Sequence, residues 1–326
     1  MSLYAIVTPV FEDQDSFAQL CSHLRALETH SETGMRFHVI AVDDGSLADP
    51  PKLDALSEVG LSGEILRLAR NVGHQVAISI GLARAYKIPN LAGCIVMDCD
   101  GEDRPETIPS LIEAVSRDKI DVAVAERAKR SESLAFRTFY GIYRRLFMML
   151  TGQKLRFGNF MALSPRALER LSGMHETATH VAGAVVKGRL RRADVPIDRG
   201  VRYAGKSKMN FPSLVLHGMR AVMVFGDLVL TRMALMLVAL ACIVVVVLVG
   251  AVTAKFMGLA TPGWVTIVTG FALSLFLQAG LFTMITLIVS SLGRVDTPLR
   301  VRERALEFVA RIDRVEPSLH IVATSN

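Results

Sequence analysis

Two long uncharged stretches constrain the fold of this chain more than any other feature of its sequence. Residues 233–254 and 264–292 contain no Asp, Glu, Lys or Arg. Each exceeds the roughly 20 residues that a helix needs to cross ~30 Å of hydrocarbon. A core helix of a soluble protein would instead carry polar residues along one face. The pattern therefore predicts a hairpin of two membrane-spanning helices over 228–293, with spans at about 230–254 and 263–292.

Basic residues flank both outer ends of this predicted hairpin. They are Arg220 and Arg232 before the uncharged stretch at 233–254, and Arg294, Arg300, Arg302 and Arg304 after the one at 264–292. Because Lys and Arg are retained on the cytosolic side of membrane helices, we expect both termini to be cytosolic. Pro9 and Glu12 interrupt the first apolar run too early for a signal peptide. The sequence thus predicts a multi-pass integral membrane protein whose N-terminal domain faces the cytosol.

Composition argues against several other classes of protein. The chain is 51% hydrophobic and 21% charged, and its formal net charge of +6 is too small to indicate nucleic-acid binding. Its four cysteines form no CxxC pair, which argues against a disulfide framework or a zinc finger. We therefore expect no nucleic acid among its partners and look for chemistry elsewhere in the sequence.

Residues 1–210 alternate between short apolar runs and helical patterns, and we expect them to form one cytosolic domain. The predicted strands are Leu3–Val10, Phe37–Val42, Glu64–Leu68, Gly93–Met97 and Asp121–Ala125. The predicted helices are Ser16–Glu28, Lys52–Ser57, His74–Tyr86 and Glu106–Ser116. Repeated strand–helix units predict an α/β, Rossmann-like domain with a mostly parallel sheet and helices on both faces. Ligands of such sheets bind beyond the carboxyl ends of the strands.

Two shorter segments flank the predicted hairpin. Residues 211–227 mix apolar residues with His217 and Arg220 and predict an interfacial helix, although the segment could also extend the first span. Residues 294–326 are expected to form a cytosolic tail. Within that tail, apolar residues at helical spacing predict an amphipathic helix over Val301–Arg314.

Carboxylates gather where two of the predicted strands end. Asp43 and Asp44 close the second strand, and Asp98, Asp100 and Glu102 follow the fourth. Such clusters are costly unless a cation or hydrogen-bond donors offset the repulsion. Oxygen ligands alone favour Mg²⁺ or Mn²⁺, completed by water and substrate phosphates, so Asp98, Asp100 and Glu102 are the predicted metal ligands. The neighbouring Asp103 could simply cap the helix that begins near Pro105.

The motifs that carry these acids occur in a familiar order. They are TPVFED (8–13), VDDGS (42–46), RNVGH (70–74), MDCD (97–100) with PE (105–106), and RGVRYAGKSKM (199–209). In this order they resemble the motifs of family 2 glycosyltransferases, and the last is similar to the R-x-x-G-x-S-K segment of the polyprenyl-phosphate branch. That resemblance implies the GT-A fold and, with two C-terminal spans, a bacterial inner-membrane enzyme of cell-envelope glycan synthesis.

The resemblance implies a role for each matching residue on the donor side. Three residues match positions that hold the nucleotide base and ribose, namely Pro9, Phe11 and Asp13. Asp43 and Asp44 match the nucleotide-binding acids. Asp98 and Asp100 match the donor- and metal-binding pair, and Glu102 stands where relatives often have a metal-binding Gln. Two basic residues, Arg202 and Lys208, match those that close over the donor diphosphate.

On the acceptor side, Arg127 and Arg137 fall near the basic residues that meet the acceptor phosphate in relatives. The spacing is shorter here, so Arg144 or Arg145 could take the place of Arg137. Asn159 stands where relatives commonly have an Asp and cannot accept a proton. A phosphate acceptor is already an anion at neutral pH and needs no strong base.

The expected function is inverting, metal-dependent transfer of a sugar from a UDP- or GDP-sugar to the phosphate of a polyprenyl (undecaprenyl or dolichyl) phosphate at the cytosolic membrane face. One alternative is transfer to a lipid hydroxyl such as that of diacylglycerol, which would require a positioned base. Another is a non-catalytic membrane partner that binds nucleotide sugars or lipids. The resemblance also implies a homo-oligomer, by analogy a tetramer.

Three histidines are possible site residues. We expect a structural or substrate-orienting role for His74, which follows the RNVG run. His175 and His180 are predicted to lie on the surface, because one cluster without further ligands makes a poor metal site.

Overall fold

The chain divides into two compact units. The computed structural model describes residues 2–31, 34–117, 119–127, 134–153, 157–198, 200–203, 211–259, 261, 263–292 and 301–315. The sheet unit comprises the described residues of Met1–Arg137, Leu155–Val224 and Pro298–Asn326. The hairpin unit comprises those of Thr138–Lys154 and Phe225–Thr297.

A mixed, mostly parallel sheet organises the sheet unit. Its strand order is β7-β5-β6-β4-β1-β2-β3-β8. The strands are β1 (Ser2–Val10), β2 (Met35–Asp43), β3 (Ser62–Leu68), β4 (Gly93–Val96), β5 (Val122–Arg127), β6 (Met161–Leu163), β7 (Arg192–Ile197) and β8 (Val309–Val315). Strands β4, β1, β2 and β3 run parallel, whereas β6 and β8 are antiparallel to their neighbours. The predicted strands and their largely parallel pairing are therefore confirmed.

Helices cover both faces of this sheet because successive strand residues point to opposite sides. The longer helices of the unit are α1 (Gln14–His30), α3 (His74–Ala85), α4 (Ile108–Ser116), α6 (Pro165–Ser172) and α9 (Phe211–Met223). Shorter ones are α2 (Asp54–Ser57), η1 (Pro105–Thr107), α7 (Glu176–Thr179), α8 (Val181–Lys187) and α12 (Val301–Leu306). Ile6 and Val39 pack with Phe17 of α1 in one core, while Val7 and Ile78 belong to the core under α3.

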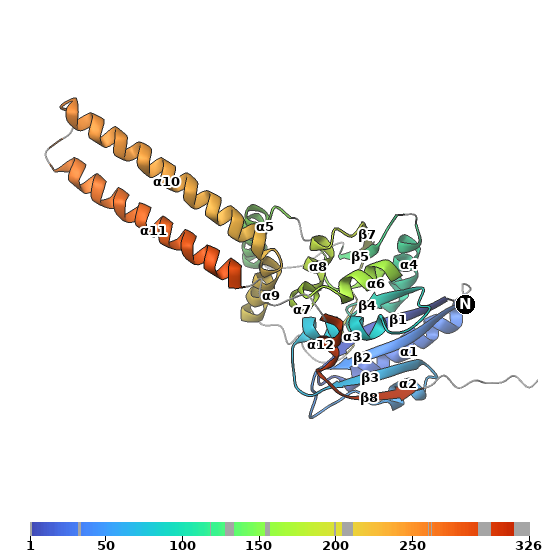
Figure 1. Cartoon of the computed structure of the whole chain (residues 1–326). Helices are drawn as coiled ribbons and strands as arrows, with labels where there is room; N and C mark the ends of the chain where they lie inside the picture. The colour runs from blue at the N-terminus through green and yellow to red at the C-terminus, as the bar shows by residue number, and fades with distance from the viewer. Residues whose placement is uncertain are drawn as a thin grey trace, which may run out of the picture. The chain divides into compact units, whose positions relative to one another are not determined.

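The segment after the hairpin departs from the prediction. Val301–Arg314 is not one amphipathic helix: α12 ends at Leu306, and β8 begins at Val309. Strand β8 pairs antiparallel with β3 at the edge of the sheet (Figure 1). The open edge of β3 offers unpaired backbone donors and acceptors, and satisfying them outweighs the helical spacing of the apolar residues.

A stacked arginine holds α12 against the rest of the sheet unit. The Arg302 guanidinium lies over the ring of Tyr86, 3.7 Å from its centroid. Its Nε donates to the Ser172 hydroxyl over 2.9 Å. The chain after the hairpin is thus held in two ways, by the side-chain contacts of α12 and by the strand pairing of β8.

The hairpin unit consists mainly of two long antiparallel helices. These are α10 (Gly226–Phe256) and α11 (Trp264–Leu292), which lie side by side (Figure 1). Only 11% of the most apolar window of each is buried, whereas a soluble core helix would be mostly buried. By length and composition both could cross a membrane.

The start of α10 is tied to the end of a helix that sequence patterns did not predict. Helix α5 covers Leu134–Thr151 and enters the hairpin unit. Arg232 of α10 donates through Nη1 to the Met149 carbonyl over 2.9 Å. The rings of Phe147 and Phe225 meet edge to face at 5.9 Å. Among the described side chains of α5, three large apolar residues are exposed, namely Leu146, Met148 and Met149.

One histidine prediction is wrong. His180 is only 3% exposed rather than at the surface, whereas the side chain of His175 is 66% exposed. The His180 Nδ1 accepts from Gly183 N at 3.0 Å and so caps α8, and its Nε2 lies 3.1 Å from His217 Nε2 on α9. Because Nδ1 accepts, the proton resides on Nε2 and is donated to His217. Burial, and then the neighbouring His217, lower the pKa of His180 to about 3.

This buried pair predicts a pH-dependent stability. The unfolded chain binds a proton at His180 near the ordinary pKa, and the folded chain only near pH 3, so stability is full above about pH 6.5 and falls with acidification. Replacing His180 with Asn retains a good helix cap and removes the titration. Between about pH 7 and pH 5 the wild type should lose ~2 kcal/mol more unfolding free energy than the variant.

Denaturant titration of the purified full chain in detergent measures this difference. Equal losses in the wild type and in His180→Asn would contradict a neutral, buried His180.

Candidate functional site

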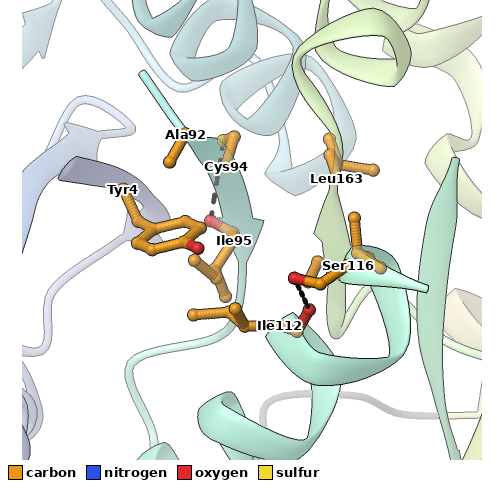
Figure 2. A pocket seen from close by; sticks show the side chains of 9 residues that line it. Tyr4, Ala92, Cys94, Ile95, Ile112, Ser116 and Leu163 are labelled. Carbon is orange, nitrogen blue, oxygen red and sulfur yellow. Dashed lines mark hydrogen bonds between the residues drawn. The ribbon is translucent and has the colours of Figure 1, made fainter. Parts of the chain in front are cut away.

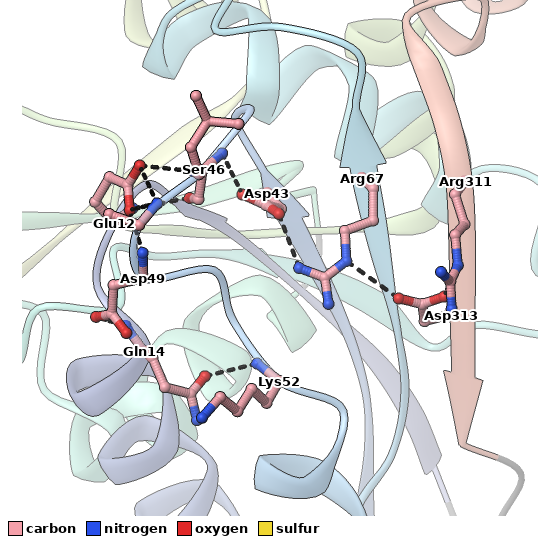
Figure 3. Close-up of polar contacts among 11 residues, drawn as sticks. Glu12, Gln14, Asp43, Ser46, Asp49, Lys52, Arg67, Arg311 and Asp313 are labelled. Atoms are coloured by element: carbon pink, nitrogen blue, oxygen red, sulfur yellow. Dashed lines mark hydrogen bonds and ion pairs between the residues drawn. The ribbon is translucent and has the colours of Figure 1, made fainter.

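The first acidic cluster lies where β2 ends. Asp43 is the last residue of that strand and is 2% exposed. Its Oδ1 accepts from Ser46 N at 3.0 Å, which closes the turn, and its Oδ2 accepts from Arg67 Nη1 at 2.8 Å (Figure 3). A buried carboxylate needs such partners to remain charged. The contacts therefore fix Asp43 at the carboxyl edge of the sheet.

Asp44 ties this edge to the start of α3. Its carboxylate accepts from the backbone N–H of Val72 at 2.7 Å and of Gly73 at 3.0 Å. Burial raises the pKa of Asp44, and the two backbone hydrogen bonds oppose that rise. Strand β2 and the RNVG run are thus held at one point of the sheet edge.

The residues predicted to hold the base and ribose lie at the end of β1 beside this cluster. Pro9 is buried opposite Val42, Phe11 is 40% exposed, and Asp13 immediately precedes α1. Between them, Glu12 has φ 49° and was not predicted to act. Its carboxylate accepts from backbone N–H groups of the loop after β2, at 2.7 Å from Leu47 N (Figure 3). Glu12 therefore shapes the loop that borders Phe11.

The second acidic cluster occupies the loop after β4. Asp98 donates its backbone N–H to Asp103 Oδ2 at 3.0 Å, so Asp103 shapes this loop as well as preceding η1. The Asp100 Oδ1 accepts from Glu102 N at 2.9 Å. Arg202 Nη2 lies 2.6 Å from Asp100 Oδ2 and 3.9 Å from Glu102 Oε1. A guanidinium from residues 200–203 thus partly neutralises the predicted metal ligands.

Residues 200–203 lie against this loop along their backbone. Gly200 N donates to Glu102 O at 2.9 Å, and Tyr203 N donates to Asp100 O at 2.8 Å. A Cβ on Gly200 would collide with Gly101 O, and one on Gly101 would lie 2.8 Å from the Tyr203 ring. Gly101 also has φ +88°. The close approach therefore requires glycine at both positions.

His74 lies between the two acidic clusters. Its Nε2 is 3.3 Å from Asp98 Oδ1 and 3.0 Å from Asn159 Nδ2. Desolvation of the ring lowers the pKa of His74, and the charges of Asp103, Asp44 and Asp100 oppose that lowering. Both clusters therefore act on one imidazole, and the structural or substrate-orienting role of His74 stays a prediction.

The donor atoms present suit a hard divalent cation only in part. Within the described ranges, no three His, Cys, Asp or Glu side chains are grouped to hold a metal ion by themselves. Asp98 and Asp100 offer carboxylate oxygens at a substrate-binding edge, and Mg²⁺ is commonly held by one or two carboxylates plus substrate phosphates. The residues fit a cation that is shared with a bound diphosphate. Glu102 as a third ligand stays a prediction.

Three predicted basic residues remain untested by the geometry. Arg127 is the last residue of β5, and Arg137 belongs to α5, but their side chains lie outside the described part of the structure. Lys208 also lies outside the described residues.

Sequence reasoning missed three residues that shape the site, Glu12, Arg67 and Tyr203, and it considered Asp103 only as a helix cap. Arg67 pairs directly with Asp43 across β2 and β3, so both side chains project from the same face of the sheet. This relation follows only from the register of the two strands, which the sequence does not give.

A small pocket lies away from this edge. Figure 2 shows Tyr4 of β1, Cys94 of β4, Ser116 of α4 and Leu163 of β6 among its lining residues. They stand near the amino ends of β1 and β4, whereas the acids follow the carboxyl ends. Because ligands of parallel sheets bind at the carboxyl ends, we do not assign the donor to this pocket.

The contact between Gly101 and Tyr203 generates a prediction. In Gly101→Ala the new methyl group should displace residues 200–203, so trypsin should cleave after Arg202 about tenfold faster than in the wild type. Gly60→Ala is a matched control, since Gly60 has φ +70° but no atom within 4 Å of the place that a Cβ would take. Mass spectrometry of timed digests measures the rate, and equal cleavage of both variants would refute the docking.

Comparison with known proteins gives a consistent result. Undecaprenyl-phosphate 4-deoxy-4-formamido-L-arabinose transferase of Klebsiella pneumoniae (strain 342) is 27% identical over 218 residues, 65% of this chain and 64% of that transferase. Dodecaprenyl-phosphate galacturonate synthase of Rhizobium johnstonii (strain DSM 114642 / LMG 32736 / 3841) is 31% identical over 138 residues, 41% of this chain and 38% of the synthase. The chain thus spans less than two thirds of either relative.

Glucosyl-3-phosphoglycerate synthase from Mycobacterium tuberculosis, in complex with Mn²⁺, UDP-glucose and phosphoglyceric acid, has a similar fold. Its TM-score is 0.51 at 13% sequence identity, covering 70% of this chain and 79% of that one. The expected GT-A fold is confirmed. The relatives also confirm the resemblance to polyprenyl-phosphate glycosyltransferases. The family model "Glycosyl transferase family 2" matches residues 5–175, more than half of the chain, which therefore belongs to that family.

Proposed function

We propose that this protein transfers a sugar from a nucleotide-sugar donor to the phosphate of a polyprenyl phosphate at the cytosolic face of a membrane. The observation that carries the proposal is the contact of Arg202 with Asp100 at the carboxyl edge of the sheet, the same edge at which Asp43 ends β2 and Asp44 follows it. The relatives named for undecaprenyl and dodecaprenyl phosphate support the acceptor class.

The donor side must stabilise a departing nucleoside diphosphate. Asp43 and Asp44 would bind the nucleoside, and Asp98 and Asp100 would hold Mg²⁺ or Mn²⁺ against the diphosphate. Such a cation supplies Lewis-acid neutralisation of the charge that builds on the leaving group. Arg202, already 2.6 Å from Asp100, would turn its bidentate donors to the same phosphates. The cation found with UDP-glucose in the mycobacterial synthase supports this assignment.

The acceptor side needs positive charge more than a base. A phosphate monoester is mostly dianionic at neutral pH and can attack the anomeric carbon directly, which inverts its configuration. Asn159 cannot remove a proton, and its amide contacts His74. Arg127 and Arg137 remain the proposed partners of the acceptor phosphate, because two anionic substrates repel one another unless cations lie between them.

Chain connectivity supports a topology with both ends on one side of the membrane. The strands before α10 and the strand after α11 belong to the same sheet, so the intervening chain crosses the bilayer an even number of times. Arg220 precedes α10, Arg232 lies near the start of α10, and Arg302 follows α11, and these positions favour the cytosolic side for both outer ends. The polyprenyl tail then stays in the bilayer, where each buried CH₂ is worth ~0.8 kcal/mol.

Sugar transfer into membrane lipid tests the proposal. Purified protein, a short polyprenyl phosphate, Mn²⁺ and a panel of radiolabelled nucleotide sugars should give a mild-acid-labile glycolipid. Asp100→Asn should slow its formation at least about 100-fold. Asp194→Asn, which neutralises the exposed acid of β7, is the matched control and should retain the rate.

A product that resists mild acid would indicate a hydroxyl acceptor and overturn the proposal. No product from any donor would favour the non-catalytic alternative.

The contact between Arg202 and Asp100 predicts that removal of the arginine side chain strengthens cation binding. Without donor, the guanidinium competes with a cation for Asp100 Oδ2, so Arg202→Ala should bind Mn²⁺ about fivefold more tightly, or ~1 kcal/mol. Arg117→Ala removes an exposed arginine paired with Glu113 and should leave the affinity unchanged. Titration of free Mn²⁺ by electron paramagnetic resonance measures both. Weaker binding in Arg202→Ala would show that Arg202 does not occupy the cation's place.

A further inference from the structure

The strand that follows both apolar helices reaches the nucleotide edge through one arginine. Arg67 of β3 donates through Nη1 to Asp43 Oδ2 at 2.8 Å and through Nε to Asp313 Oδ2 at 3.1 Å (Figure 3). Asp313 lies on β8, 246 residues further along the chain. A residue encoded after the hairpin therefore contacts the partner of a predicted nucleotide-binding acid.

Sheet register places these side chains on one face. Asp43 pairs with Arg67 between β2 and β3, and Arg67 pairs with Arg311 between β3 and β8. Asp313 is two residues beyond Arg311 and so projects from the same face of β8. Cross-strand and diagonal neighbours on one face lie within reach of long side chains. The row Asp43, Arg67, Asp313, Arg311 alternates in charge across three strands.

The four side chains of this row differ in how deeply they are buried. The side chain of Asp43 is 4% exposed, that of Asp313 12% and that of Arg67 25%, whereas that of Arg311 is 76% exposed. Arg67 is therefore held at two edges of its guanidinium by two largely buried carboxylates. With Asp313 neutralised, the guanidinium keeps one anchor and can rotate, and Asp43 loses a fixed partner.

We propose that Asp313 is a positioning residue for the donor: it fixes Arg67, and through Arg67 it holds Asp43 in the orientation that binds the nucleotide. The inference rests on the proposed function of Asp43. It makes β8, which lies beyond the residues matched by the family model, part of the donor site.

The other face of the same strand pair supplies a matched control. There, Arg314 Nε of β8 lies 3.1 Å from Glu64 Oε2 of β3, and Glu64 also pairs with Arg84 of α3 at 2.6 Å. This ion pair ties β8 to β3 without touching Arg67. Loss of strand pairing alone should therefore affect Arg314→Gln and Asp313→Asn alike.

Nucleotide binding to the purified full chain tests the proposal. With Mn²⁺ present, UDP and GDP are titrated calorimetrically, and the nucleotide bound by the wild type is used for the variants. Asp313→Asn should weaken its affinity about fivefold, as coupled residues of one ion-pair network do, and raise the donor KM without changing the acceptor KM. Arg314→Gln should bind as the wild type does. Thermal denaturation of both variants reports any shared loss of strand stability.

A second background establishes the route. In Arg67→Gln, which removes the shared guanidinium, Asp313→Asn should cause no further loss of nucleotide affinity. Equal affinities of Asp313→Asn, Arg314→Gln and wild type would overturn the inference and leave the proposed function intact. Additive losses in the Arg67→Gln background would also overturn it. Failure of the wild type to bind any nucleoside diphosphate would overturn the proposed function itself, and the inference with it.

Discussion

Mutual repulsion among carboxylates is the constraint on which the candidate site depends. One acidic cluster follows β2 and the other follows β4, both at the carboxyl edge of the sheet. Charges from both clusters favour the protonated form of His74. Three sets of partners offset the repulsion: backbone N–H groups donate to Asp44, one guanidinium pairs with Asp43, and another pairs with Asp100. Each of these partners comes from a different element. The edge is therefore assembled by the tertiary structure, and a divalent cation with a diphosphate would complete its neutralisation.

Most of the architecture could be predicted from local patterns. Short apolar runs at residues 3–10 or 37–42 are buried strands, and the two uncharged stretches are long apolar helices, because both signals arise within a few neighbouring residues. Residues 309–315 could not be assigned this way. Their spacing fits a helix, and only the open edge of β3, hundreds of residues earlier, makes them a strand. Helix α5 follows the predicted strand at 121–125 but was not predicted, because its many aromatic residues have weaker helix propensity than the residues of the predicted helices.

The acids of the site could be found from sequence, but their partners could not. Asp43, Asp44, Asp98 and Asp100 stand directly after strand patterns, so their place at the sheet edge follows from topology. Arg67 and Tyr203 gain meaning only through register and loop packing, which a single sequence does not contain. The burial of His180 is a further example, since its partner His217 lies on a helix 37 residues away.

Pairing of β8 with β3 also has a consequence for how the molecule is made. During synthesis the parallel strands and their helices emerge first, then the two apolar helices, and only afterwards the strand that covers the β3 edge. Until then that edge is an unprotected template for other strands. Completion of the cytosolic sheet is therefore tied to delivery of the hairpin into the bilayer. If synthesis stalled after the apolar helices and before β8, the intermediate would expose the β3 edge and be prone to aggregation.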